Sequence, residues 1–262
     1  MLRENEIVGG RFRLERLLGE GGMGVVWAAH DLGTDRRVAL KFLRVANLTE
    51  QIAKRFYREA RAAMAVRHPN VVRIHEVFVG TDGRPVMSMD YLEGESLAER
   101  LEREGKLSLA AFSEVFLPVV SAIGAAHERG IIHRDLKPEN IFLCRTMTGF
   151  EVRVLDFGIA KLTASDGEAA ATAGLTATGA MMGTPYYMSP EQVFAHKDID
   201  HRSDIWSLGV IMYECLSGKK PVRGDSIGAI LQVIMTAIPE PLRVVEPTLP
   251  PDLLALADAM LT

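Results

Sequence analysis

Apolar and polar residues follow two different patterns along the chain, and the pattern changes near residue 92. Over residues 12–30, apolar residues alternate with polar ones or gather around valines, and glycines interrupt the run. This pattern is typical of two strands joined as a hairpin. It continues with four elements, in the order strand, helix, strand and strand, over about residues 37–43, 52–63, 71–79 and 85–89. The first part of the chain is therefore predicted to be rich in strands.

Beyond residue 92 the apolar residues recur mainly at helical spacing. Helices are predicted over about residues 109–129, 204–216 and 227–235. Gly130 and Gly218 follow two of them, where a helix commonly ends in a left-handed residue. Pro118 lies inside the first and predicts a kink. Residues 163–182 are rich in Ala, Thr and Gly with little periodicity, and predict a long mobile loop.

These patterns together predict an α+β protein of 262 residues, with a tail over residues 1–10, a strand-rich part over 11–92 and a mainly helical part over 93–262. Apolar residues make up 48% and charged residues 24%, which is ordinary for a globular protein. The net charge of −4 gives no electrostatic reason to expect nucleic acid or an anionic membrane as a partner.

Cysteine usage and hydropathy bear on the location of the protein. The chain has two cysteines, Cys144 and Cys215, which argues against a disulfide framework or a zinc site and favours a reducing cytosol. The N-terminal residues are polar and lack a hydrophobic signal segment. The best candidate for a membrane span, residues 205–216, is shorter than the ~20 residues required and predicts a buried helix. We therefore expect a cytoplasmic segment without membrane contact.

The first predicted hairpin carries a glycine motif, Gly19-Glu20-Gly21-Gly22-Met23-Gly24, which matches G-x-G-x-x-G. In dinucleotide-binding folds a helix opens directly after these glycines. Here residues 25–29 predict a strand instead. A strand-loop-strand hairpin can lay backbone N–H groups over a triphosphate, and a plain turn is the alternative.

Three motifs follow in a fixed order in the second half of the chain. They are His133-Arg134-Asp135-Leu136-Lys137-Pro138-Glu139-Asn140, then Asp156-Phe157-Gly158, and then Gly183-Thr184-Pro185 leading into Ser189-Pro190-Glu191. This order resembles the Hanks-type serine/threonine protein kinases of the bacterial kind. The resemblance covers about residues 10–262 and implies a bilobal fold, with an antiparallel sheet and one main helix in the N-lobe and a mainly helical C-lobe.

The resemblance implies ATP and a divalent metal as cofactors and assigns the chemistry to few residues. Asp135 is expected to accept or orient the proton of the substrate hydroxyl, and Lys137 to neutralise charge on the phosphoryl group. Asn140 and Asp156 are expected to bind Mg²⁺, for which Mn²⁺ could substitute. His133 is expected to be a packed residue without chemistry.

Lys41 lies within an otherwise apolar predicted strand, where burial without a partner would be costly. Glu59 interrupts the apolar stripe of the following helix and would be its counter-ion. In the kinase family such a pair lets the lysine hold the α- and β-phosphates. The alternatives are a surface lysine on an edge strand and a glutamate on the solvated edge of the helix.

The resemblance also implies an adenine pocket. Met89 is expected to gate its back, and residues 90–92 to form the hinge whose backbone binds the adenine edge. Val26 and Ala39 would lie above the ring and Leu143 below it, with ordinary core packing as the alternative. The expected ATP-binding set is Leu18, Gly19, Glu20, Gly21, Gly22, Met23, Gly24, Val26, Ala39, Lys41, Met89, Asp90, Leu92 and Leu143.

Residues 183–191 resemble the loop that seats the phosphoacceptor in protein kinases. Thr184 and Lys137 resemble serine/threonine rather than tyrosine kinases, and Ser189 stands where alanine is commoner. Small-molecule phosphotransferases share the fold but lack this segment. Asp204 is expected to cap the helix it begins, to hold backbone N–H groups of the loop around Asp135, or to do both.

Regulation is inferred from the residues around this loop. In kinases with an arginine at the position of Arg134, a phosphorylated loop often docks on it. Thr176 and Thr178 resemble autophosphorylated positions, and a dimer could phosphorylate them in trans. A Ser/Thr-rich linker without a regulatory role is the alternative.

The chain ends before a helix that kinase domains usually contain and that carries an arginine paired with the carboxylate at Glu191. A truncated C-lobe is therefore expected, in which a buried Glu191 without its partner costs ~3–5 kcal/mol. A nucleotide-binding pseudokinase scaffold and an inactive fragment stay open as alternatives to an active kinase. Lys41, Asp135 and Asp156 are all present, which argues against the scaffold. Bacterial relatives often carry a membrane span beyond the kinase, so a longer parent protein could be membrane-tethered.

Overall fold

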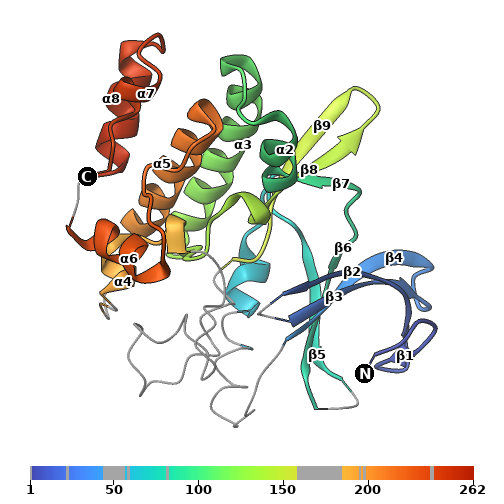
Figure 1. Cartoon of the computed structure of the whole chain (residues 1–262). Coiled ribbons are helices and arrows are strands. Elements are labelled where there is room, and N and C mark those ends of the chain that lie inside the picture. Colours follow the sequence, from blue (N-terminus) through green and yellow to red (C-terminus); the bar gives the residue numbers. More distant parts are fainter. Residues whose placement is uncertain are drawn as a thin grey trace. The chain divides into compact units, whose positions relative to one another are not determined.

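A computed structural model describes residues 2–21, 24–43, 57, 60–80, 83–157, 185–194, 196, 199–236 and 239–262. The chain divides into two compact units, which we call the first and the second unit. The boundary between them falls between Glu93 and Gly94. Figure 1 labels their helices and strands.

In the described part of the first unit the backbone forms a six-stranded antiparallel sheet, with strand order β1-β2-β3-β4-β6-β5. The sheet is curled (Figure 1). Its strands are β1 (Ile7–Val8), β2 (Phe12–Gly21), β3 (Gly24–Asp31), β4 (Arg36–Leu43), β5 (Ile74–Val79) and β6 (Pro85–Asp90). The predicted strands are therefore confirmed, although β5 begins three residues later than expected. Helical backbone is described at residues 57 and 60–65.

One face of this sheet carries the core of the first unit, which consists of alternate residues from neighbouring strands, as the two-residue period of a strand requires. Phe12 stacks on Phe78 with ring centroids 5.4 Å apart. The buried residues of this core cluster are Val8, Phe12, Leu14, Trp27, Ala29, Val38, Leu40, Phe42 and Val86. Because Val8 belongs to it, the expected N-terminal tail instead contributes an edge strand, in which Ile7 and Val8 pair with Arg13 and Phe12.

The second unit is mainly helical, as predicted. Its α-helices are α2 (Leu97–Glu104), α3 (Leu109–His127), α4 (Pro190–Val193), α5 (Arg202–Ser217), α6 (Ile227–Thr236), α7 (Leu242–Val245) and α8 (Pro251–Met260). Two 3-10 helices are described, η1 (Pro138–Asn140) and η3 (Pro185–Tyr187). Gly130 and Gly218 have φ angles of 70° and 69°, which confirms the predicted left-handed residues after α3 and α5.

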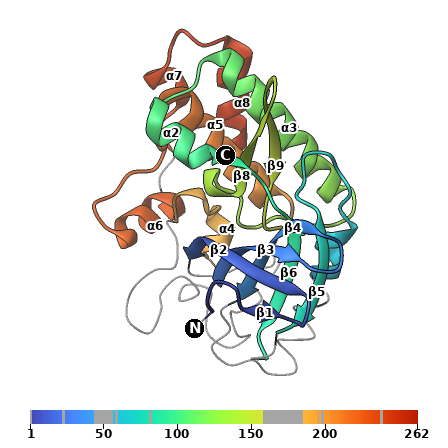
Figure 2. The same cartoon turned by 90° about the vertical axis from the view of Figure 1, so that its right-hand side faces the viewer.

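A small sheet also lies in the second unit and was not expected there. Among the described residues it has three strands, β7 (Gly94–Ser96), β8 (Ile141–Thr146) and β9 (Gly149–Val154), in that order. Figure 2 shows β8 and β9 from a second direction, with β9 beside α3.

Helix α5 is buried on nearly all sides and packs against α3 and α8. Gly209 makes the close approach of the last helix possible. A Cβ atom at this position would lie 2.9 Å from Cβ of Met260 and 3.0 Å from Cδ2 of Leu261. Cys215 also lies in this helix, and its burial raises the pKa of the thiol. Neither Cys215 nor Cys144 forms a disulfide.

The expectation that no apolar segment is long enough to cross a membrane was wrong for one helix of the described chain. Helix α3 has 19 residues, and its most apolar window has a mean hydropathy of 1.8. Its buried residues form part of the core of the second unit, and helices in the core of a protein are often as long and as apolar as a membrane span. They are Phe112, Val115, Phe116, Val119, Ala122, Ile123 and Ala126.

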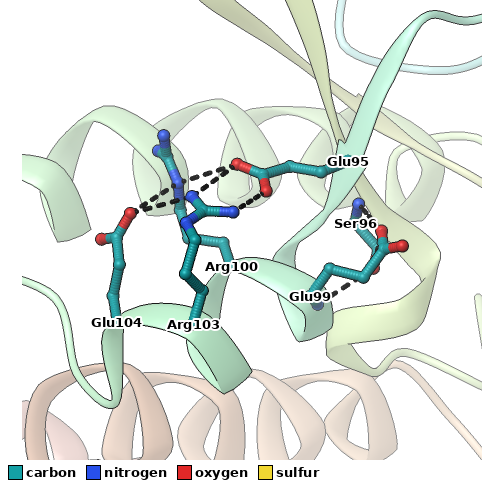
Figure 3. Close-up of polar contacts among 6 residues, drawn as sticks. All are labelled: Glu95, Ser96, Glu99, Arg100, Arg103 and Glu104. Atoms are coloured by element: carbon teal, nitrogen blue, oxygen red, sulfur yellow. Dashed lines mark hydrogen bonds and ion pairs between the residues drawn. The ribbon is translucent and has the colours of Figure 1, made fainter.

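Helix α2 begins with a reciprocal pair of capping hydrogen bonds (Figure 3). The backbone N–H of Glu99 donates to Oγ of Ser96 at 3.2 Å, and the N–H of Ser96 donates to Oε2 of Glu99 at 2.7 Å. Above the helix, Arg103 reaches back to Glu95 of β7, and this contact lowers the pKa of Glu95. Arg100 lies beside the same carboxylate, with Nε 3.3 Å from Oε1.

We predict that Ser96→Ala lowers the free energy of unfolding by about 1 kcal/mol, because it removes the acceptor for the first turn of α2. Urea unfolding followed by circular dichroism measures the change. Ser113→Ala is the matched control, since Ser113 donates to the carbonyl of Leu109 within α3 and caps nothing. Equal effects at both positions would contradict the capping role.

Candidate active site

Lys41 lies in the middle of the first unit's sheet, in β4 between β3 and β6, and only 7% of the residue is exposed. The register places it opposite Val26 of β3 and Met87 of β6. Ala39, two residues earlier, lies opposite Met89. Because side chains alternate along a strand, these five residues share one face of the sheet, opposite to the face of the core cluster. Sheet register thus brings together the residues expected to contact the phosphates and the adenine.

The glycine motif joins β2 to β3 as a hairpin, in which Gly19 pairs with Val26 and Gly21 with Gly24. The strand after the glycines excludes the dinucleotide fold, which needs a helix there. Gly24 has a φ of 147°, and a Cβ atom on it would lie 1.9 Å from the carbonyl oxygen of Phe42. Only glycine fits at that position. Leu18 and Glu20 lie in β2, whereas Gly22 and Met23 lie outside the described residues.

The expected hinge residues leave the sheet at the end of β6. The N–H of Asp90 donates to the carbonyl of Arg73 at 3.0 Å, and its carboxylate lies 3.0 Å from Nε2 of His75. The hydroxyl of Tyr91 accepts a hydrogen bond from Arg16 at 2.8 Å. These contacts fix the start of the hinge within the first unit, and Leu92 follows it.

In the second unit the carboxylate of Asp204 is 0% exposed and holds the backbone of residues 133–140, which we call the catalytic loop. The N–H of His133 donates to Oδ2 and the N–H of Arg134 to Oδ1, both at 2.8 Å. Nε2 of His127 donates to Oδ2 at 2.7 Å. Burial acts to raise the pKa of Asp204, but the hydrogen bonds that its carboxylate accepts from His127 and from the N–H groups of His133 and Arg134 hold the pKa below its ordinary value.

This arrangement confirms one of the two roles expected for Asp204 and corrects the other. Helix α5 begins at Arg202, so Asp204 lies inside its first turn, and no side chain caps the helix at His201 in the described structure. Both carboxylate oxygens instead serve the catalytic loop and His127. A cap must precede the helix, and the sequence pattern placed the start of α5 two residues too late.

Arg134 adopts a left-handed backbone with φ of 65°, an unfavourable conformation for a residue with a side chain. Its N–H is held by Asp204, and its carbonyl accepts a hydrogen bond from Nε2 of Gln192 at 2.8 Å. Such strain persists where surrounding contacts over-determine the backbone, and it is common at functional sites. Asp135 directly follows this strained residue.

His133 is fully buried and uses both ring nitrogens. Nε2 donates to the carbonyl of Leu155 at 2.7 Å, and Nδ1 lies 3.3 Å from the N–H of Asp135. A proton on Nε2 and a lone pair on Nδ1 satisfy both contacts, so the neutral ring fits the site. Phe157 packs on the ring with centroids 4.8 Å apart. The geometry supports the expected structural role.

Asp135, Lys137 and Asn140 form one interlocked group in the catalytic loop. Nζ of Lys137 lies 2.9 Å from Oδ2 of Asp135. Nδ2 of Asn140 donates to the backbone carbonyl of Asp135 at 2.7 Å and approaches Oδ2 at 3.2 Å. The side chains of Asp135 and Lys137 remain 25% and 22% exposed, so a substrate can reach them.

Asn140 and Asp156 are brought together by backbone pairing. Ile141 of β8 lies opposite Val154 of β9, and the N–H of Leu155 donates to the carbonyl of Asn140 at 2.8 Å. Asp156 is the next residue and has a left-handed φ of 56°. The Nδ2 contacts of Asn140 to Asp135 do not use its Oδ1. An amide oxygen and a carboxylate are both among the oxygen ligands that Mg²⁺ prefers.

The segment after residue 184 joins the same framework. Tyr187 donates to Glu214 at 2.5 Å and is buried, which raises the pKa of its hydroxyl. Glu191, expected to lack a partner, accepts a hydrogen bond from the hydroxyl of Ser203. Leu143 of β8 is buried and lies opposite Val152 of β9.

Six expected site residues lie outside the described residues, namely Gly22, Met23, Glu59, Thr176, Thr178 and Thr184. Two residues of this framework were not predicted from the sequence: His127, which donates to Asp204, and Gln192, which donates to the carbonyl of Arg134. His127 ends the helix before the loop, and Gln192 directly follows the Ser-Pro-Glu motif. The only sequence signal for either residue was its position near a motif, because a histidine or a glutamine at these positions does not by itself indicate which group it contacts.

Comparison with known proteins agrees with this geometry. Residues 12–262 match the family described as protein kinase domain. The chain is 42% identical over 234 residues to the serine/threonine-protein kinase pkn3 of Myxococcus xanthus, covering 88% of this chain and 42% of that protein. It is 42% identical over 249 residues to the serine/threonine-protein kinase PknA of Mycobacterium tuberculosis, covering 93% of this chain and 54% of that protein.

The chain belongs to the protein kinase family. Its similarity to several bacterial serine/threonine-protein kinases confirms the expected fold and class of enzyme, and the family implies ATP and a divalent metal. The chain spans about half or less of the length of these curated relatives.

We predict that Asp204→Asn lowers the free energy of unfolding by ~3 kcal/mol, because an amide cannot accept from all three N–H groups and turns its own NH₂ toward one of them. Because the pKa of Asp204 is lowered in the folded state, the ionised carboxylate stabilises the fold at pH values above its ordinary pKa of 3.8. This stabilisation is lost as the pH falls through the pKa of the folded state. The difference in the free energy of unfolding between the wild type and the variant should therefore become smaller at acidic pH.

Urea unfolding between neutral and acidic pH measures both effects. The matched control is Asp225→Asn, an exposed aspartate, which should change stability by less than about 0.5 kcal/mol. An equally stable Asp204→Asn variant at neutral pH would contradict the anchoring role of this carboxylate.

Proposed function

We propose that the protein transfers the γ-phosphoryl group of ATP to serine and threonine hydroxyls of protein substrates. The observation that carries this proposal is the interlocked group of Asp135, Lys137 and Asn140, held on a buried carboxylate, with Asp156 next to Asn140 through backbone pairing. The presence of Lys41 on the face shared with Val26, Ala39 and Met89 supports it from the first unit.

Phosphoryl transfer passes through a loose transition state with charge spread over the non-bridging oxygens, so catalysis is mainly positioning and electrostatics. The oxygen of the acceptor hydroxyl forms a bond to the γ-phosphorus while the bond to the bridging oxygen of ADP breaks. Asp135 orients this hydroxyl and accepts its proton. Lys137, held 2.9 Å from Asp135, places a positive charge beside the transferred group.

Asn140 and Asp156 would hold Mg²⁺, with Mn²⁺ as a substitute, and the metal when bound neutralises charge on the phosphates. In the first unit, Lys41 would hold the α- and β-phosphates once Glu59 pairs with it. The glycine hairpin would cover the phosphates with backbone N–H groups. On the first unit, Met89, Val26 and Ala39 would contact the adenine, and Leu143 of the second unit is proposed for the same role.

The low cysteine content, with two cysteines in 262 residues, and the need for ATP support a cytoplasmic location for this domain. Its net charge of −4 supports protein substrates rather than nucleic acid. A longer parent protein could still be tethered to a membrane through a further region.

We predict that Asp135→Asn lowers the rate of ³²P transfer from Mg-ATP to a basic protein substrate at least ~100-fold, since it removes the proton acceptor. Its Kd for ATP should stay within about threefold, because Asp135 contacts the acceptor rather than the nucleotide. The exposed Asp252→Asn serves as the matched control and should transfer at the wild-type rate. Wild-type ATP binding without transfer would instead identify a scaffold or an inactive fragment.

Autophosphorylation gives a second prediction. Thr176 and Thr178 are proposed acceptors, and their phosphates would dock on Arg134 by charge-assisted hydrogen bonds. The double variant Thr176→Ala/Thr178→Ala is expected to lose ~10-fold in activity, while phosphosite mapping of the wild type finds phosphate at one or both positions. Rates that rise with the square of the protein concentration would indicate transfer between two molecules, as in a transient dimer. Full activity of the double variant would refute the regulatory role.

A further inference from the structure

Gln192 connects two buried backbone segments of the second unit with one side chain. Its Oε1 accepts from the N–H of Ser189 at 3.0 Å, and its Nε2 donates to the carbonyl of Arg134 at 2.8 Å. The residue is 5% exposed, so water cannot replace these bonds at little cost. The opposite amide orientation would set donor against donor and acceptor against acceptor, so the contacts fix the side chain.

The bond to Arg134 acts on the peptide group that leads into Asp135. Asp204 holds the two preceding peptide groups through the N–H groups of His133 and Arg134. Gln192 holds the third through its carbonyl, and the N–H of the same peptide group faces Nδ1 of His133. Three successive peptide planes are thus fixed, which determines the strained left-handed conformation of Arg134 and the direction in which Asp135 leaves the backbone.

The other end of the Gln192 side chain is connected to α5 through Ser189. The buried hydroxyl of Ser189 donates to the hydroxyl of Ser203 at 3.1 Å, and Ser203 lies next to Asp204 in the first turn of α5. A closed path therefore runs from the catalytic loop through Gln192 and Ser189 to α5 and back through Asp204. A shift of residues 189–192 would pull directly on the peptide group before Asp135.

From this geometry we infer that Gln192 is a positioning residue, which orients Asp135 for proton acceptance by holding the carbonyl of Arg134. The inference rests on the proposed kinase function, since it assigns Gln192 an effect on the same reaction. It concerns the turnover of bound substrates rather than ATP binding, because the hydrogen bonds of the Gln192 side chain go to Ser189 and to the catalytic loop. A residue that acts on geometry in this way changes kcat more than KM.

Two substitutions separate the contacts of Gln192. Gln192→Glu keeps an acceptor for Ser189 but turns a second oxygen toward the carbonyl of Arg134, and Gln192→Met keeps the approximate length and removes both hydrogen bonds. Each should lower kcat about 10-fold, while the KM for ATP stays within about twofold. The matched controls are Gln232→Glu and Gln232→Met on the exposed face of α6, which should leave kcat unchanged.

Amide hydrogen exchange at neutral pH provides a readout that does not need activity. In both Gln192 variants the amides of residues 133–136 should exchange ~10-fold faster, with α3 and α6 unchanged, because the loop loses one of its fixed peptide groups. If the wild-type protein shows no phosphoryl transfer, the kinase function is refuted. Amide hydrogen exchange would still test whether Gln192 holds the backbone of the catalytic loop.

Three results would overturn the inference. The first is unchanged kcat and unchanged exchange in both variants, and the second is faster exchange of residues 133–136 with unchanged kcat. The third is loss of the folded state in both variants, which would assign Gln192 to stability rather than to positioning.

Discussion

The carboxylate of Asp204 is the contact on which the rest of the second unit's site depends. Its buried oxygens accept from two backbone N–H groups of the catalytic loop and from His127. A buried carboxylate is stable only when such donors surround it, and the strained backbone of Arg134 persists only when it is held. Each therefore stabilises the other, and Asp135 is oriented as a consequence.

A second set of contacts extends this anchoring to the two expected metal ligands, Asn140 and Asp156. His133 and Asn140 bind the carbonyl and the N–H of Leu155, so the end of β9 is fixed on the catalytic loop. Asp156 follows directly. Asp135, the proposed base, and the two expected metal ligands thus belong to one hydrogen-bonded framework built on α5, which suits a reaction that is catalysed mainly by positioning and charge.

Much of this could be predicted from local sequence. The hairpin of β2 and β3, the buried strand of Lys41 and the glycine ends of α3 and α5 follow from periodicity and backbone preference within a few residues. Strands β1 and β7 could not be predicted, because a strand of two or three residues is too short to show an alternation of apolar and polar residues. Tertiary packing determines which strands they pair with. The contact of Gln192 spans 58 positions to Arg134, and nothing near either residue indicates it.

The most direct test of the account is a crystal structure of the chain with Mg²⁺ and a non-hydrolysable ATP analogue. We expect Oδ1 of Asn140 and the carboxylate of Asp156 to coordinate the metal at about 2.0–2.1 Å, with the hydrogen bonds of Asp204 to the catalytic loop retained. The account would be contradicted if the metal bound without Asn140 and Asp156, or if the catalytic loop lost its hydrogen bonds to Asp204 when the nucleotide binds.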